Sequence, residues 1–158
     1  MRGPERCLLC GRDRSVRLWR ASSYAGQGGS GFDGSAESLA ALAMARKLAA
    51  TTTATIHALD VVSLPTIEYG GYLGPSFEQA IQAPLERARQ RLSELPGVTG
   101  RAVPGVAGEE LAAFGDDVDI LVVGSRGIGP VRRLVLGSTS NYLVRHGRCP
   151  LLVLTRSV

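Results

Sequence analysis

The sequence predicts a single α/β domain: an open, mostly parallel five-stranded sheet with helices on both faces. Apolar segments typical of buried strands alternate with segments whose apolar residues recur at helical spacing. Such alternation is typical of parallel sheets, because a crossover helix carries the chain from one parallel strand to the next. The length of 158 residues suits one domain with a proper hydrophobic core.

The first half of the chain contains two predicted helices around a strand. Ser35 is a suitable N-cap for a helix whose apolar positions are Leu39, Leu42, Ala43 and Leu48. Residues 53–62 are rich in β-branched side chains and predict a strand. The second helix carries an apolar stripe made of Phe77, Ile81, Leu85, Ala88 and Leu92. Pro84 within this stripe either kinks the helix or marks its first turn.

The second half continues the alternation. The predicted elements are a weaker strand at 98–106, a short helix at 109–114, a buried strand at 119–123, a helix at 138–146 and a last strand at 151–155. Ligands of open parallel sheets bind beyond the carboxyl ends of the strands, where the strand order reverses. We therefore expect the functional site at the carboxyl edge of this sheet.

A glycine motif lies at such a strand end. Gly124 ends the buried strand, and Gly127 lets the backbone turn tightly enough to expose its N–H groups. Gly137, Ser138 and Thr139 open the next helix. Backbone N–H groups at a turn and at a helix N-terminus bind anions without needing a lysine. The motif predicts a phosphate site.

The spacing Gly-x2-Gly-x9-Gly-Ser resembles the nucleotide-binding signature of the universal stress protein family, specifically its ATP-binding branch. The Phe-Asp-Gly-Ser turn at 32–35 and the helix-to-strand passage at 145–150 also resemble that family. The resemblance covers about residues 31–156. It implies an adenine-nucleotide α-hydrolase-like fold, with residues 31–158 forming the universal stress protein domain.

The resemblance also implies a nucleotide site. It assigns the adenine end to Asp33 and to the backbone of Ala58, which follows His57. The remaining nucleotide-binding residues that it implies are Gly124 and Gly127 at the ribose and phosphates, Gly137, Ser138 and Thr139 at the phosphates, and Arg126 within reach of a phosphate. The implied ligand is ATP, with Mg²⁺ bound through the ATP phosphates and not by protein ligands.

The implied function is nucleotide-dependent stress response or signalling, in which bound ATP sets conformation or partner choice. Two alternatives stay open: a slow nucleotide hydrolase or phosphotransferase, and a nucleotide-free interaction module. Any ATP hydrolysis should be slow, because no general base with an arginine-plus-lysine set stands out. The apolar strand at 151–155 is expected at a sheet edge, where two copies of the chain would pair as a homodimer.

The first 30 residues form an atypical segment rich in arginine, glycine and serine. In the family, a buried apolar strand precedes the turn at 32–35, whereas residues 23–31 here offer little to bury and carry glycines that disfavour a strand. Residues 16–19 are a candidate substitute strand. The alternative, which we favour, is that residues 1 to about 31 are disordered or are not the native start, as after a misassigned start or a frameshift.

Charge and cysteine content exclude several other classes. The first 20 residues hold six arginines and two acidic side chains, which accounts for the whole net charge of +4. The rest of the chain is neutral, so we expect no nucleic-acid partner. No apolar run approaches the length of a membrane span, and three cysteines cannot all pair, so a cytoplasmic protein is expected.

Three other motifs are weak. The Gly-x-Gly-x-x-Gly match at 26–31 lacks a hydrophobic strand before it, so it does not predict a dinucleotide site, even though Asp60 ends a later strand. The single lysine, Lys47, follows no glycine, which excludes a Walker-type loop. Cys7 and Cys10 lack a second ligand pair, so they do not predict a zinc site.

Overall fold

The computed structural model describes residues 26–63, 75–125 and 137–154. They contain a five-stranded sheet of order β3-β2-β1-β4-β5 in which every pairing is parallel. The strands are β1 (Gln27–Gly31), β2 (Thr55–Ser63), β3 (Val98–Gly105), β4 (Ile120–Gly124) and β5 (Leu151–Leu154). The helices are α1 (Ala36–Ala50), α2 (Pro75–Ser93), α3 (Ala107–Phe114) and α4 (Ser138–His146), with a 3-10 turn η1 (Gly115–Asp117). The predicted fold class is confirmed.

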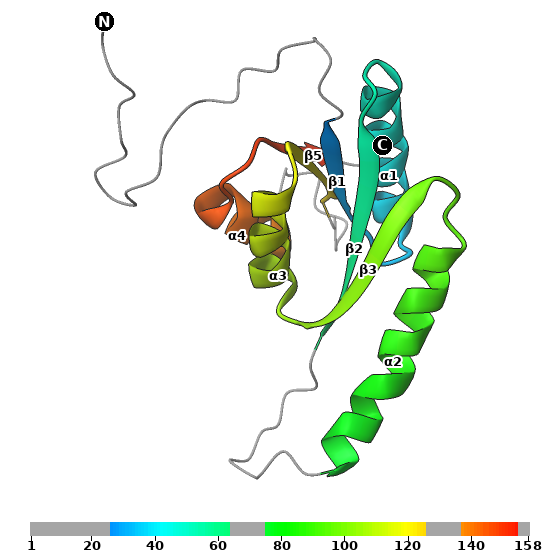
Figure 1. The fold of residues 1–158 in the computed structure, drawn as a ribbon. Coiled ribbons are helices and arrows are strands. Elements are labelled where there is room, and N and C mark those ends of the chain that lie inside the picture. The colour runs from blue at the N-terminus through cyan, green and yellow to red at the C-terminus, as the bar shows by residue number, and fades with distance from the viewer. Residues whose placement is uncertain (1–25, 64–74, 126–136, 155–158) are drawn as a thin grey trace, which may run out of the picture.

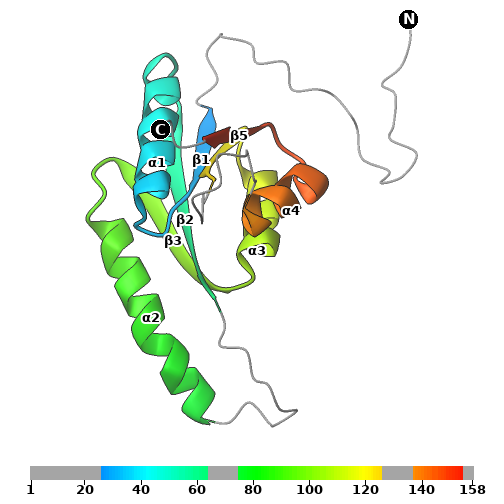
Figure 2. The same ribbon diagram turned by 180° about the vertical axis from the view of Figure 1, so that it is seen from behind.

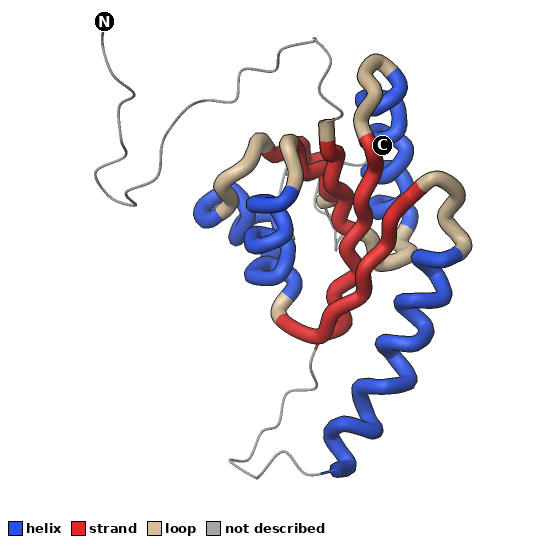
Figure 3. Tube along the Cα trace, in the orientation of Figure 1, coloured by secondary structure: helices blue, strands red, loops and turns tan. Residues whose placement is uncertain are grey.

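Helices cover both faces of the sheet. Figures 1 and 2 show α1 and α2 on one side and α3 and α4 on the other. Figure 3 shows strand and helix alternating along the described chain. Two apolar clusters fill the space between the layers. The cluster under α1 and α2 includes Phe32, Leu42, Ile56, Leu92 and Val122, and the cluster under α3 and α4 includes Leu59, Leu111, Phe114, Leu121 and Leu143.

Strand β1 corrects the sequence interpretation, because the expectation that residues 23–31 would not form a strand is wrong for Gln27–Gly31. This strand is central: it pairs with β2 along its whole length and with β4 at Gly28, Gly29 and Ser30. Pairing with two neighbouring strands stabilises the extended conformation of these residues, although glycine has a low propensity for strands. The candidate substitute strand at 16–19 lies outside the described residues.

Side chains from neighbouring elements occupy the space beside the glycines of β1. A Cβ atom at Gly29 would lie 2.8 Å from Cγ2 of Val118 and 3.1 Å from Cε1 of Phe114. A Cβ atom at Gly31 would lie 3.3 Å from Cδ2 of Leu111. On the α3 face, therefore, the core contains large residues from α3 and its surroundings where a conventional strand would supply its own.

Helix α1 packs differently from its predicted stripe. Ser35 is its N-cap, as predicted, but Leu39 is 50% exposed and Ala43 is also exposed. The buried positions are Ser38, Ala41, Leu42 and Ala45. Small side chains dominate this buried face, so the helix can approach the sheet closely, and the larger Leu39 lies on the outer face.

Helix α2 follows its prediction more closely. Ile81, Leu85, Ala88 and Leu92 are all buried at helical spacing. The helix continues across Pro84, so that residue does not mark the first turn. The side chain of Phe77 lies outside the described residues. Helix α4 has the predicted bounds, and the other predicted bounds differ from the structure by at most two residues.

Candidate functional site

The chain leaves two adjacent central strands toward opposite faces of the sheet. After β1 it forms α1 on one face, and α4, the next described element after β4, lies on the other face. The register pairs Ser30 with Val122, so the carboxyl ends of β1 and β4 lie side by side. This arrangement is a topological switch point, the usual ligand crevice of an open α/β sheet. It brings together the predicted residues Asp33 and Gly124.

The turn after β1 is held by its own side chains. Oδ1 of Asp33 accepts a hydrogen bond of 3.0 Å from the backbone N–H of Ser35. Oγ of Ser35 accepts one of 3.2 Å from the N–H of Ser38, which caps α1. Gly34 has φ +81°, a left-handed conformation that favours glycine. The half-buried Asp33 is therefore presented in a defined geometry at the start of a helix.

Gly124 is required by a contact within the protein. A Cβ atom there would lie 2.7 Å from the carbonyl carbon, the carbonyl oxygen and the Cβ of Glu37 in the first turn of α1. Backbone atoms cannot swing aside as the end of a side chain can. The absence of a side chain at Gly124 lets α1 begin directly against the end of β4. The next residue, Ser125, is buried and donates its backbone N–H to the carbonyl of Leu154 at 2.8 Å.

The third predicted part is the N-terminus of α4. Gly137 is the N-cap, with φ −59° and ψ 162°, and no side chain caps the helix in the described residues. Ser138 is exposed and Thr139 is half-buried. The helix has no acidic residue in its first turn and carries Arg145 and His146 in its last. Because α4 leads back to the amino end of β5, its N-terminus faces the carboxyl edge of the sheet, with its positive dipole end there.

The remaining predicted residues are less favourably placed or lie outside the described residues. Ala58 is 1% exposed and lies within β2, opposite Ser30 of β1 and Gly100 of β3. A residue flanked by two strands uses its backbone N–H and C=O in the ladders. A base contact through the backbone of Ala58 would have to replace such a bond. Arg126 and Gly127 lie outside the described residues.

A charged pair beside the switch point escaped the sequence analysis. Nη2 of Arg91 on α2 lies 2.8 Å from Oδ2 of Asp60 on β2, and the side chain of Asp60 is only 2% exposed. Burial, as the main cause, and the nearby negative charge of Asp33 raise the pKa of Asp60, while Arg91 opposes this shift. One signal in the sequence bears on this pair: Arg91 directly precedes Leu92 of the apolar stripe, so it lies at the border of the buried face of the helix.

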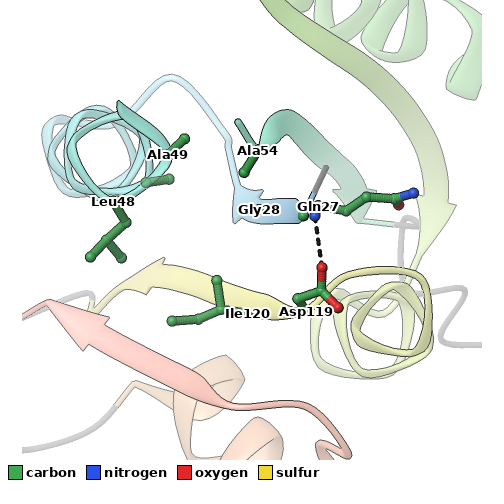
Figure 4. A pocket seen from close by; sticks show the side chains of 9 residues that line it. Gln27, Gly28, Leu48, Ala49, Ala54, Asp119 and Ile120 are labelled. Atoms are coloured by element: carbon green, nitrogen blue, oxygen red, sulfur yellow. Dashed lines mark hydrogen bonds between the residues drawn. The ribbon is translucent and has the colours of Figure 1, made fainter. Parts of the chain in front are cut away.

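A shallow hollow lies at the opposite, amino edge of the sheet (Figure 4). Gly26, Gly28, Ala49 and Ala54 are among the small residues that line it, together with Leu48, Asp119 and Ile120. Its volume is about 10 Å³, the room of about one water molecule. Asp119 accepts a hydrogen bond of 2.8 Å from the backbone N–H of Gln27. The hollow lies away from the predicted site.

The fold and the carboxyl edge of the sheet define the class: a parallel α/β domain with a topological switch point between β1 and β4, which the N-terminus of α4 faces. The model of the Universal stress protein family matches residues 30–155. The chain therefore belongs to that family. A curated relative from Thermus aquaticus, the universal stress protein in QAH/OAS sulfhydrylase 3' region, is 34% identical over 134 residues, which are 77% of this chain and 93% of the relative.

Solved structures of the family have the same fold. The universal stress protein UspA from Lactobacillus plantarum superposes with a TM-score of 0.65 at 22% identity, covering 84% of this chain and 99% of that one. A universal stress protein in complex with cAMP superposes with a TM-score of 0.55 at 25% identity, covering 85% of this chain and 100% of that one. Across the parts of the chain that the structure describes, no helix has the length and apolar character of a membrane span.

Proposed function

We propose that this protein binds ATP at the switch point between β1 and β4 and that the bound nucleotide sets its conformation or its choice of partner in a stress response. The observation that carries the proposal is the meeting of Asp33 and Gly124 at adjacent strand ends, with the N-terminus of α4 facing the same edge. A family structure in complex with cAMP adds support, since cAMP is also an adenine nucleotide.

Different groups of the protein would bind the nucleoside and the phosphates. Asp33 offers carboxylate oxygens to hydroxyl or amino donors at the nucleoside end. The phosphates are assigned to Gly124, Arg126, Gly127 and the N–H groups of the first turn of α4. Ala58 is retained for the adenine, although its flanked position makes it the weakest of these assignments. Mg²⁺ would be bound through the ATP phosphates. Any hydrolysis of ATP would be slow. The cytoplasm is the proposed compartment.

Calorimetric titration with MgATP tests this assignment. The backbone angles of Gly137 are open to any residue, so Gly137→Val should fold normally while its side chain blocks the approach of a phosphate. Gly97→Asn is the matched control, because Gly97 has φ +69° and open space around it, and it precedes β3 at the amino edge, away from the proposed site. Asparagine tolerates that conformation.

We expect the wild-type protein and Gly97→Asn to bind MgATP and Gly137→Val to lose binding. At 100 times its Kd, ATP should stabilise the wild-type protein by about 2.7 kcal/mol. The absence of any thermal shift at saturating MgATP would reject the proposal. Equal affinities of the wild-type protein and Gly137→Val would reject the role given to α4. A turnover assay on the same sample separates a binding protein from a hydrolase.

We also propose a homodimer through β5. This strand ends the sheet order and pairs with β4 among the described residues, and all four of its residues are half-buried. Antiparallel pairing of two copies across a twofold axis would satisfy the free edge. Val153→Pro removes a backbone donor and should shift the protein toward monomer, with circular dichroism as the control for folding. Light scattering that finds the wild-type protein monomeric at micromolar concentration would reject the dimer.

A further inference from the structure

Arg91 links three elements beside the proposed nucleotide site. Its guanidinium group contacts Asp60 on β2, with 2.8 Å between Nη2 and Oδ2. Its aliphatic chain passes over Gly34, where an added Cβ would lie only 3.1 Å from Cδ of Arg91. One side chain of α2 therefore contacts both β2 and the turn that carries Asp33.

This contact is poorly suited to stabilising the fold. The carboxylate of Asp60 is almost fully removed from water. Nε of Arg91 is buried and has no hydrogen-bond partner among the described residues. Burying a charge and leaving a donor unsatisfied both oppose folding, and an apolar pair of similar volume often stabilises a protein equally well. The pair therefore calls for an explanation other than stability.

The charges around the pair supply part of that explanation. The negative charge of Asp33 acts on Asp60, so two carboxylates lie near each other at the carboxyl edge of the sheet. Without the positive charge of Arg91, these two carboxylates would repel an anionic ligand. Arg91 is 42% exposed, so its positive charge offsets Asp60 and still reaches the surface beside the turn.

We propose that Arg91, anchored by Asp60, is a positioning residue that holds the turn at 32–35 and so orients Asp33 for the nucleoside end of a nucleotide. Asp60 holds the guanidinium in place, and the aliphatic chain of Arg91 packs against Gly34. The inference rests on the proposed function for its ligand, but the positioning of the turn is a property of the unliganded protein.

The test uses an apolar double variant that removes the buried charges together. Asp60→Val/Arg91→Met leaves no unpaired carboxylate, so its melting temperature should stay near that of the wild-type protein. Arg89→Met is the matched control: Arg89 lies on the same helix, is exposed, and forms a surface pair of 3.3 Å with Glu86. Arg91→Lys retains the charge and tests for partial rescue.

The first readout needs no ligand. Exchange of the Ser35 amide, which donates to Asp33, should be about tenfold faster or more in the double variant, while amides of β4 exchange at wild-type rates. The second readout is MgATP affinity by calorimetry, which should fall about tenfold or more, a loss typical of removing a group that orients a ligand-binding residue. Arg91→Lys should recover part of both effects, and Arg89→Met should show neither.

Two results would overturn the inference. One is a Ser35 amide that exchanges in the double variant at the same rate as in the wild-type protein. The other is an MgATP affinity of the double variant equal to that of the wild-type protein, which would make the pair purely structural. If the wild-type protein binds no MgATP, the proposed function fails, and the exchange of Ser35 alone decides the inference: selectively faster exchange supports positioning of the turn, and unchanged exchange rejects it.

Discussion

Helix α1 contacts the sheet closely at one end and loosely at the other. At its N-terminus, the backbone of Glu37 lies against Gly124 so closely that no Cβ would fit. At its C-terminal half, Ala45, Leu48 and Ala49 stand over Gly28 and leave the small hollow of Figure 4. Both ends meet glycine-containing strands, so glycine by itself does not determine how closely the layers pack. The tight end is the one beside the candidate site, next to the turn that carries Asp33 and Ser35.

Gly124→Val should break the tight end and have the largest effect. The new side chain would meet backbone atoms of α1, which can move only if the whole helix moves. We expect a loss of about 3 kcal/mol in the free energy of unfolding, at the upper end of overpacking effects. Urea denaturation measures it. A loss below about 1 kcal/mol would mean that α1 shifts easily and that the contact is not tight.

Gly29→Ala tests the opposite face of β1, where Val118 and Phe114 fill the space. The added methyl group would lie 2.8 Å from Cγ2 of Val118, but side chains can adjust in part. The expected loss is about 1–3 kcal/mol. A matched substitution, Gly29→Ala with Val118→Ala, should recover part of it if the clash is the cause. No recovery in the double variant would point to a backbone effect.

The pH dependence of Asp60 provides a third test, at the charged pair beside the turn that leads into α1. Its pKa is raised above the ordinary value of 3.8, chiefly by burial, with Asp33 adding to the shift and Arg91 opposing it. The folded state therefore binds the proton more tightly than the unfolded state. Stability contributed by this proton is fully present below pH 3.8 and is lost as the pH rises through the folded-state pKa. Asp60→Asn should remove this component from the pH profile of unfolding, and an identical profile would contradict the direction of the shift.

Gly28→Ala should sharpen the comparison by filling the loose end, with the smallest effect. Its Cβ would lie 3.2 Å from the mobile Cδ1 end of Ile56, beside the hollow. Replacing a strand glycine lowers the entropy of the unfolded chain, so we expect a gain of about 0.5–1 kcal/mol. Thermal unfolding measures it. A loss comparable to that of Gly124→Val would show that the two ends of α1 are equally tight.

Local patterns in the sequence predicted much of the frame. Ser35 was identified as a cap, and Ile81, Leu85, Ala88 and Leu92 were identified as one buried stripe. These predictions succeeded because a cap and a helical stripe depend on neighbours within a few residues. The assignments of Asp33, Gly124 and the start of α4 to a nucleotide stay predictions, as do those of Arg126 and Gly127.

Other features depend on contacts between distant residues. Asp60 and Arg91 are 31 positions apart and meet only because α2 packs against β2. Leu39 is exposed because α1 turns Ala41, Leu42 and Ala45 toward the sheet, which leaves Leu39 on the outer face. The apolar residues of α1 recur on more than one face of the helix, so their spacing alone does not determine which face is buried.

By itself, the sequence determined the alternation of strands and helices and the parallel sheet, because both follow from local periodicity. The ligand edge that the glycine spacing indicates stays a prediction. Only the tertiary structure decided that Gln27–Gly31 is the central strand. Its residues favour no strand, and the ladders of β2 and β4, with the side chains of Val118 and Phe114, supply what it lacks. The physical reason is that burial and pairing are properties of the assembled layers, and they outweigh the weak preference of a few residues.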